Sequence, residues 1–363
     1  MITNLNETPQ NNADNFQEKR TLLALMAQKK TAEKSDVSYD QDKIPKVPRN
    51  GKDYFPLSFS QERMWFMEQL QPGNPAYIVS TAYHITGQLN TDYLEKSFCE
   101  ISKRHEIWRT TFEVRNGQPV QIVHPETFVR LSKVDLQELA PQAGKLEVEK
   151  LIEKESTKPI NITQGPLWRV QLITLAKEEH VLILTSHHLI IDGTSIGILL
   201  KELAEYYSAY INNQFYELSP LPIQYVDYAV WQRQSALESG QVEFWDEKLQ
   251  GELPVLELPF DHPRPPIQTL NSKTHWQMIS NPLFSKIQKF SSKYGATRVM
   301  VLMATFKVLL HHYSGLTDII VGVPVAGRTH PDVQLLMGCF INNMVIRTQI
   351  QREMSYNDWI NHV

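Results

Sequence analysis

The junction between a strand and a helix at residues 179–212 constrains the fold more than any other feature of this sequence. The run "EHVLILTSHH" (179–188) is mostly apolar until its last residues, which is typical of a strand in the core. A similar run at 167–176 predicts a hairpin with it. An Asp-Gly pair follows at 192–193, and then a helical pattern over 194–212. The core strand therefore ends in two imidazoles, and we expect at least one of them to have a function.

Strand alternation separates His187 from His188. Successive side chains of a strand point to opposite faces, so the two imidazoles cannot serve one site from the same face. We therefore expect no His-His-Asp metal site, because metal ligands usually converge at spacings such as i and i+4 on a helix. One histidine should face a channel or an interface. The other should face the core and need a hydrogen-bond partner.

Asp192 and Gly193 follow the histidines closely enough to act with them. Asp192 either orients an imidazole, as a carboxylate does in a catalytic triad, or forms a buried ion pair that fixes the turn into the helix. Gly193 suits a tight turn and a close approach of the backbone. Its N–H lies at the start of the helix, where a developing oxyanion would be stabilised.

A second histidine pair provides a comparison within the chain. His311-His312 in "LLHHYSGLTD" lacks the Asp-Gly pair and is interpreted as a helix end, where the helix dipole favours cationic residues. The frame H-H-x-x-x-D-G between an apolar strand and a helix is far more specific than a histidine pair alone.

Length and composition limit the class of protein. With 363 residues the chain is too long for one ordinary core, so we expect two domains or lobes. The net charge of -4 leaves no surplus of Lys and Arg for nucleic-acid phosphates. Cys99 and Cys339 are too few for a disulfide framework and indicate a reducing compartment. The N-terminus lacks a signal peptide and no apolar run reaches membrane-spanning length, so the expected location is cytoplasmic.

Helical and strand patterns recur along both halves of the chain. Residues 1–15 are predicted to be disordered, 15–30 to form a helix, and the globular body to begin near Tyr54. Pro-rich crossings place the boundary between two lobes near 225–265. Further helices are predicted at 58–70, 91–105 with Thr91 as N-cap, 144–158, 225–250, 281–295 and 297–315, and further strands at 76–88, 118–124, 273–280, 318–326 and 340–350.

The segment "HHLIIDG" (His187–Gly193) resembles the core motif of condensation domains of nonribosomal peptide synthetases. Other segments resemble further motifs of this family in the expected order, namely 57–77, 104–112, 225–234, 258–266, 319–328 and 337–348. The resemblance runs from about Ile44 to near the end of the chain. Within the family, "RMWFMEQLQPGNPAY" and "RHEIWRTTF" are most similar to the type that accepts L-configured donors.

The resemblance implies an α/β fold class with two α+β two-layer lobes, each like chloramphenicol acetyltransferase, set in a V around a central tunnel. Residues 1–50 are then expected to hold an N-terminal tail, a short helix and a linker. Residues 51–228 would form the N-terminal lobe with the histidines, and 229–363 an incomplete C-terminal lobe. The second lobe is expected to be truncated because the sequence stops just after the family's fifth motif.

The resemblance also implies the reaction and the partners. A donor and an acceptor, each on the 4′-phosphopantetheine arm of a carrier domain, would meet in the tunnel and form an amide bond. The implied partners are an upstream donor and a downstream acceptor peptidyl carrier domain, with an adenylation domain downstream. No cofactor or metal is expected on the chain itself, and neither nucleic acid nor membrane as a partner. Residues 16–30 are expected either to dock the upstream carrier or to form a frayed tail.

The residues that match the core motif take their expected roles from the resemblance. His188 would be the catalytic residue, acting either as general base toward the acceptor amine or by positioning that amine and stabilising the tetrahedral intermediate. His187, Asp192 and Gly193 would support it.

Two further expectations concern residues outside the core motif. A buried arginine would hold Asp192, and the unranked candidates are Arg104, Arg109 and Arg347. Asn342 matches the asparagine of the family's "FINN" segment, and it either meets the tunnel or is a buried hydrogen-bonding residue.

Other functions compete with amide formation. Epimerisation uses the same histidine frame, but the opening motif with Arg63-Met64-Trp65 argues against it. Heterocyclisation is disfavoured because its doubled aspartate motif is absent. A non-catalytic carrier-docking module or an inactive truncated remnant is the main alternative, although docking modules usually lose the histidines that this chain keeps. Acyl transfer to a small diffusible acceptor would be excluded if both substrates are carrier-linked.

Overall fold

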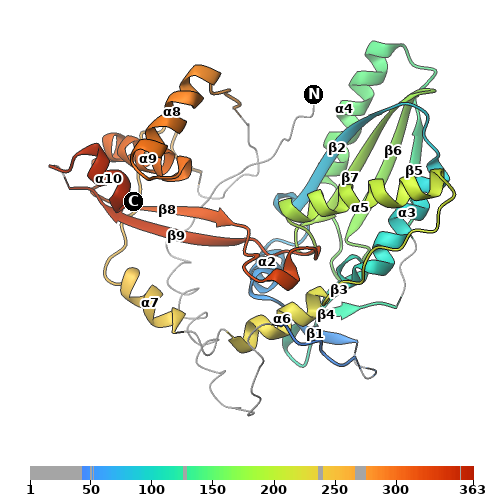
Figure 1. Ribbon diagram of the computed structural model, residues 1–363, viewed down its shortest axis with the longest axis horizontal. Coiled ribbons are helices and arrows are strands. Elements are labelled where there is room, and N and C mark those ends of the chain that lie inside the picture. The colour runs from blue at the N-terminus through green and yellow to red at the C-terminus, as the bar shows by residue number, and fades with distance from the viewer. Residues whose placement is uncertain are drawn as a thin grey trace. The chain divides into compact units, whose positions relative to one another are not determined.

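The computed structural model describes residues 43–49, 51, 53–125, 129–235, 240–265, 275–351 and 353–363 (Figure 1). These residues form two compact units. The first takes the described part of Asp40–Ser239 together with Ala326–Asn342, and the second takes that of Gly240–Val325 and Asn343–Val363. The tail and helix predicted at 1–30 lie outside the described residues. The predicted lobes 51–228 and 229–363 stay a prediction.

A four-stranded sheet forms the centre of the first unit. Its strand order is β2 (Ile78–Thr86), β7 (Glu179–His187), β6 (Trp168–Ala176) and β5 (Leu131–Asp135). β7 pairs antiparallel with β2 and β6, which confirms the predicted hairpin, and β5 runs parallel to β6. β7 is buried at every position after Glu179 because it lies inside the sheet, and this explains its continuous apolar sequence.

Helices cover both faces of this sheet (Figure 1). α3 (Thr91–Arg104) and α5 (Gly193–Ile211) lie on one face, where Leu184 joins the main core. α4 (Pro141–Thr157) lies on the other face, where Ile183 belongs to a second core cluster. The alternation of β7 therefore sends successive side chains into two different cores.

Thr91, which was predicted to be the N-cap, is already the first residue of α3, and the N-cap is Asn90. The side-chain oxygen of Asn90 accepts hydrogen bonds from the N–H groups of Asp92 and Tyr93 (3.1 and 3.0 Å). The prediction of Thr91 as the N-cap is therefore wrong. Asn is as strong a capping residue as Thr, and it stands directly before Thr91.

The first unit has a second sheet and further helices. The second sheet has the strand order β1 (Tyr54–Pro56), β4 (Gln118–Val123) and β3 (Thr110–Arg115). The other helices are α2 (Phe59–Leu70), α6 (Tyr225–Ser235) and the short 3₁₀ helices η1 (Pro75–Tyr77), η2 (Glu106–Arg109) and η4 (Pro331–Val333). α2 opens with a capping box in which Ser58 and Gln61 each accept a hydrogen bond from the other's backbone N–H.

The second unit contains α7 (Gln241–Lys248), α8 (Asn281–Lys293), α9 (Arg298–Ser314), α10 (Tyr356–His362) and the paired strands β8 (Asp318–Val325) and β9 (Asn342–Gln349). Trp359 of α10 donates a hydrogen bond from Nε1 to Ala304 O of α9 (3.0 Å). Buried Lys307 ties α9 to β9 through Ile346 O (2.9 Å) and Thr348 Oγ1, and burial lowers the pKa of Lys307 to about 8. In the described part of the chain, no helix is long and apolar enough to cross a membrane.

Two predicted elements differ from the structure. The strand predicted at 273–280 is absent from its described part, 275–280, where Trp276 and Met278 are 65% and 93% exposed. The helix predicted at 225–250 consists of α6 and α7, which belong to different units. Local periodicity reports which side chains could share a face, but a strand also needs a neighbour to pair with.

Candidate active site

His187 and His188 lie at the end of β7 in different surroundings. His187 closes the strand and is fully buried, and its Nδ1 accepts a hydrogen bond from Leu189 N–H (3.2 Å). His188 follows the strand, is only partly buried, and donates its backbone N–H to Tyr77 O (2.8 Å). The prediction that one imidazole lies in the core on a hydrogen-bond partner is confirmed by His187.

The imidazole of His188 is mainly neutral at pH 7. Burial lowers its pKa from the ordinary 6.5, while hydrogen bonding to the backbone of His188 and Ile191 and the charge of Asp192 act in the opposite direction. The Cys339 thiol lies 4.0 Å from His188 Nδ1, and burial raises the pKa of Cys339 to about 12. Because that thiol stays protonated, the basic group at this point is the imidazole.

Asp192 is the centre of a buried hydrogen-bond network. Its carboxylate caps α5 by accepting from the N–H and the hydroxyl of Ser195 (both 2.7 Å). It also accepts from Phe340 N–H (3.2 Å) and from Arg328 Nη2 (3.1 and 3.3 Å). The Asp192 and Arg328 side chains are 3% and 4% exposed, so their charges compensate each other away from water. Of the two interpretations of Asp192, the structure supports the buried ion pair.

The partner of Asp192 is Arg328, so the prediction that Arg104, Arg109 or Arg347 holds it is wrong. Arg104 bonds to Glu202 (3.0 Å), Arg109 bonds to His124 O and lies 3.6 Å from Glu106, and Arg347 bonds to Asp318 (2.7 Å) in the second unit. Arg328 stands 136 positions after Asp192, and only the fold brings them together. The sequence signal for it was an arginine directly after an apolar strand and a glycine.

The segment 326–342 is fixed against the turn that follows His188. Arg328 Nη1 donates to two backbone carbonyls of this segment (2.7 Å each), and its guanidinium carbon lies 4.1 Å from the centre of the Phe340 ring. The Ser195 hydroxyl, whose proton goes to Asp192, accepts from Gly338 N–H (3.0 Å) and lies 3.0 Å from Gly338 O. Sequence reasoning missed Ser195, although it stands three residues after Asp192, at the spacing of a helix cap.

Glycine is needed at other positions than the one predicted. At Gly193 an added Cβ would meet no atom within 4 Å and φ is not positive, so the predicted tight turn and close backbone approach are wrong. At Gly338 (φ 155°) an added Cβ would collide with the Tyr225 ring, and at Gly327 (φ 64°) with Phe340 O. These two glycines let the segment 326–342 lie close to its neighbours.

Asn342 lies at the end of the same segment, where β9 begins. Its side-chain oxygen accepts a hydrogen bond from Arg63 Nη1 (2.8 Å), and Arg63 Nη2 donates to Ile341 O (3.2 Å). Asn342 is exposed, so the interpretation as a buried asparagine is wrong. That it meets a tunnel stays a prediction.

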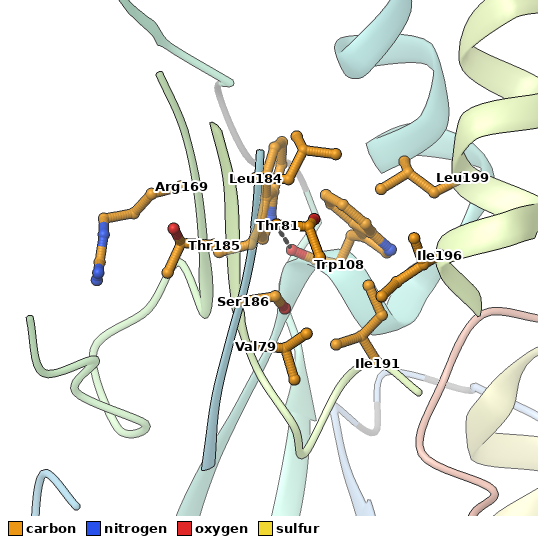
Figure 2. Close-up of a pocket in the computed structure, with 11 residues that line it drawn as sticks. Val79, Thr81, Trp108, Arg169, Leu184, Thr185, Ser186, Ile191, Ile196 and Leu199 are labelled. Carbon is orange, nitrogen blue, oxygen red and sulfur yellow. Dashed lines mark hydrogen bonds between the residues drawn. The ribbon is translucent and has the colours of Figure 1, made fainter. Parts of the chain in front are cut away.

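A small cavity lies between the sheet and α5, next to the turn at residues 188–190, which is called the histidine turn below (Figure 2). It is lined mainly by Val79, Leu184, Ile191, Ile196 and Leu199 with the ring of Trp108, while Figure 2 shows Arg169 and Thr185 on the other side of the strands. Its volume is about 10 Å³, which is room for roughly one water molecule. It is therefore too small to be a substrate site.

Related sequences agree with the resemblance predicted above. The sequence profile described as "Condensation domain" matches residues 52–363. A linear gramicidin synthase of Brevibacillus parabrevis is 38% identical over 330 residues, which are 90% of this chain and 6% of that protein. Phosphinothricin tripeptide synthetase PhsC of Streptomyces viridochromogenes is 35% identical over 88% of this chain and 30% of that protein. The chain thus spans a minor part of these relatives.

Solved structures confirm the predicted α+β fold of the chloramphenicol acetyltransferase type. The X-domain from teicoplanin biosynthesis has a TM-score of 0.78 and 26% identity, over 88% of this chain and 70% of that one. The first condensation domain of the CDA synthetase has a TM-score of 0.68 and 20% identity, over 86% of this chain and 74% of that one. At 20% identity the second likeness supports the fold alone.

Proposed function

The chain belongs to the condensation-domain family of nonribosomal peptide synthetases, and from this premise we propose that it catalyses amide-bond formation between two carrier-bound substrates. The acceptor's amine nitrogen attacks the carbonyl carbon of the donor thioester. A C–N bond forms, the C–S bond breaks, the donor carrier's thiol leaves and the nitrogen loses a proton. The chain would thus act as an acyltransferase.

The observation that carries this proposal is the state of His188. Its imidazole is mainly neutral and partly exposed, on a turn held by the buried Asp192–Arg328 pair. A free α-amine has a pKa of about 8, which is above that of His188. Orienting the amine and stabilising the tetrahedral intermediate are therefore the larger contributions of His188, and proton transfer follows once the C–N bond makes the nitrogen acidic.

The proposed partners are an upstream donor and a downstream acceptor peptidyl carrier domain. Each would bring its substrate on a 4′-phosphopantetheine arm, the donor being L-configured, and an adenylation domain would load the acceptor carrier. The small share of the relatives that this chain spans supports further domains in the same assembly line. A cytoplasmic location would match this role.

Mass spectrometry of intact carrier proteins tests the proposal. The chain is mixed with one donor-loaded and one acceptor-loaded carrier protein. The acceptor carrier should gain the mass of the donor acyl group. With His188→Ala the rate should fall by roughly 10²-fold or more, the usual contribution of an acid–base or positioning group.

His312→Ala is the matched control, because His312 belongs to the histidine pair without Asp-Gly and lies exposed on α9. It should leave the mass gain unchanged. If His188→Ala retained the wild-type rate, the assignment of His188 would be wrong.

A second candidate is the docking of partner proteins without catalysis. The likeness to the X-domain from teicoplanin biosynthesis favours it, and an X-domain from that system was solved in complex with OxyB. The same experiment separates the two functions. Binding of loaded carriers to the folded chain without any mass gain would replace the first candidate with the second.

A further inference from the structure

Two buried polar atoms face each other directly beneath the histidine turn. Glu68 of α2 and His187 are 6% and 1% exposed. Glu68 Oε2 lies 3.7 Å from His187 Nε2, and neither atom has a hydrogen-bond partner in the described part of the chain. Buried polar atoms rarely stay unpaired, and the separation of 3.7 Å is within the range of an ion pair but longer than a hydrogen bond. Each atom is therefore the candidate hydrogen-bond partner of the other, within reach of a small side-chain rotation.

The other ring nitrogen fixes the position of the proton on His187. Leu189 N–H donates to Nδ1 at 3.2 Å, so Nδ1 must offer a lone pair. A neutral imidazole with an unprotonated Nδ1 carries its proton on Nε2. Nε2 is the ring nitrogen that lies 3.7 Å from Glu68 Oε2, and an ionised carboxylate can only accept a hydrogen bond.

The second oxygen of Glu68 holds the loop whose end accepts a hydrogen bond from the backbone of His188. Glu68 Oε1 accepts from Gly73 N–H (2.7 Å), which fixes the loop that leads into η1. Tyr77 ends η1, and its carbonyl accepts the backbone N–H of His188 (2.8 Å). The Tyr77 ring also lies over His187, with centroids 6.4 Å apart and an angle of 28° between the planes. Glu68 is thus linked to His188 indirectly in two ways, through the neighbouring residue His187 and through the loop that ends at Tyr77.

From this geometry we propose that Glu68 is a positioning residue, which holds His187 in the Nε2–H tautomer and so sets the direction in which His188 is presented. The kinetic consequence rests on the proposed function, but the tautomer and the environment of His188 do not. Sequence reasoning missed Glu68, because an acidic residue in the last turn of an amphipathic helix normally faces solvent.

Nitrogen NMR of ¹⁵N-histidine-labelled protein tests the proposal without any reaction. Two-bond N–H correlations distinguish the two neutral tautomers, and the absence of one signal in His187→Gln assigns His187. The wild type should show the Nε2–H tautomer. An Nδ1–H tautomer or an imidazolium ion at His187 would overturn the proposal without the need for any other variant.

Glu68→Gln is the decisive variant because it keeps the shape and replaces two acceptor oxygens by one acceptor and one donor. It cannot accept from both Gly73 N–H and His187 Nε2–H, so His187 should lose its single tautomer and the titration of His188 should shift. Glu62→Gln is the matched control on the same helix, where Glu62 pairs with Arg233. It should leave both histidines unchanged. Identical His187 and His188 spectra in Glu68→Gln and wild type would contradict the proposal.

The kinetic test uses the carrier assay described above. Glu68→Gln should lower the rate of amide formation by about 10- to 100-fold, the scale of a displaced reacting group, with little change in the acceptor concentration at half-saturation. Glu68→Asp keeps both acceptors and should recover part of the rate, which also covers the case that Glu68→Gln does not fold. Wild-type rates in Glu68→Gln would contradict the positioning role.

The two proposals can fail separately. If the wild type forms no amide, the proposed function fails, while the NMR spectra still decide whether Glu68 positions His187 or only packs against it.

Discussion

Asp192 and Arg328 are the residues whose separation should cost the most stability. Arg328→Met would leave the Asp192 carboxylate buried with an uncompensated charge. We expect the free energy of unfolding to fall by about 3–5 kcal/mol, the usual cost of breaking a buried pair. Urea denaturation of the wild type and the variant measures this difference.

Two further variants separate the charge effect from general disruption. Adding Asp192→Asn to Arg328→Met removes the lone charge and should restore part of the stability. Arg115→Met removes ion pairs with Glu113 and Asp53 in which the side chains are 36% to 56% exposed, so its effect should be far smaller. Similar losses for Arg328→Met and Arg115→Met would argue against a special role of the buried pair.

The lowered pKa of His188 predicts a dependence of stability on pH. In the unfolded chain the imidazole titrates at the ordinary 6.5, while burial keeps the folded imidazole neutral to lower pH. Below 6.5 the unfolded state therefore binds more protons, and stability decreases as the pH falls toward the folded pKa. Relative to His188→Gln, the wild type should lose unfolding free energy between pH 6.5 and 5 and keep it above 6.5. A difference that is constant over this range would show that His188 is not desolvated.

The sequence singled out the two histidines, but it did not identify the partners of Asp192. Strand alternation is a local rule, so it correctly predicted that one of the two imidazoles lies in the core, and the structure shows that this one is His187. Arg328 and Ser195 meet at Asp192 through contacts that span 136 and 3 positions of sequence. The short contact had a recognisable cap spacing. The long one depends on where the segment 326–342 folds, and the local signal at Arg328, an arginine after an apolar strand and a glycine, does not report that position.

Two glycines of different elements should respond in opposite ways to the same substitution. Gly338→Ala places a methyl group into the Tyr225 ring and should cost about 1–3 kcal/mol, as overpacking usually does. Gly197 lies exposed inside α5 with free space around it, so Gly197→Ala should stabilise by about 0.5–1 kcal/mol. Thermal unfolding of both variants decides the matter. A stabilising Gly338→Ala would show that the segment 326–342 is not packed against Tyr225.

Long periodic elements were the ones that the sequence predicted well. α3, α5, β6 and β7 each span nine residues or more, and their apolar spacing leaves little choice of structure. β1 has three residues, too few for any period to show. The strand predicted at 273–280 had the right alternation, but its described part pairs with no neighbouring strand in the described chain. Element type followed from the pattern most securely in long elements, although the six-residue β4 also matches the strand predicted at 118–124.

The path of the whole chain decides which residues share a unit. The chain leaves the second unit after β8, contributes the segment 326–342 to the first unit, and continues into β9. All residues around His188 that are described above therefore belong to one unit, although Arg328 and Cys339 follow the histidines by well over a hundred positions. A single boundary near 225–265 leaves out that residues 326–342, which come after it, belong to the first unit.

The second unit carries an apolar stripe on its longest helix. Val299, Leu302, Phe306, Leu309 and Tyr313 of α9 are between 46% and 65% exposed. Their spacing of three and four residues places them on one face of the helix. Single exposed apolar residues are common on soluble proteins, but a continuous patch binds apolar molecules and promotes association. We therefore expect the double variant Leu302→Gln, Phe306→Gln to bind much less of a fluorescent apolar dye than the wild type.

The matched control for this variant lies in the first unit. Leu146 of α4 is 52% exposed, so Leu146→Gln makes the same chemical change outside the stripe and should leave dye fluorescence nearly unchanged. Equal unfolding midpoints of all three proteins would show that the loss reflects the removed surface and not a change in folding. If the double variant bound as much dye as the wild type, the stripe would not be the dye-binding surface. Other exposed side chains of the second unit, such as Trp276 and Phe244, would then have to account for it.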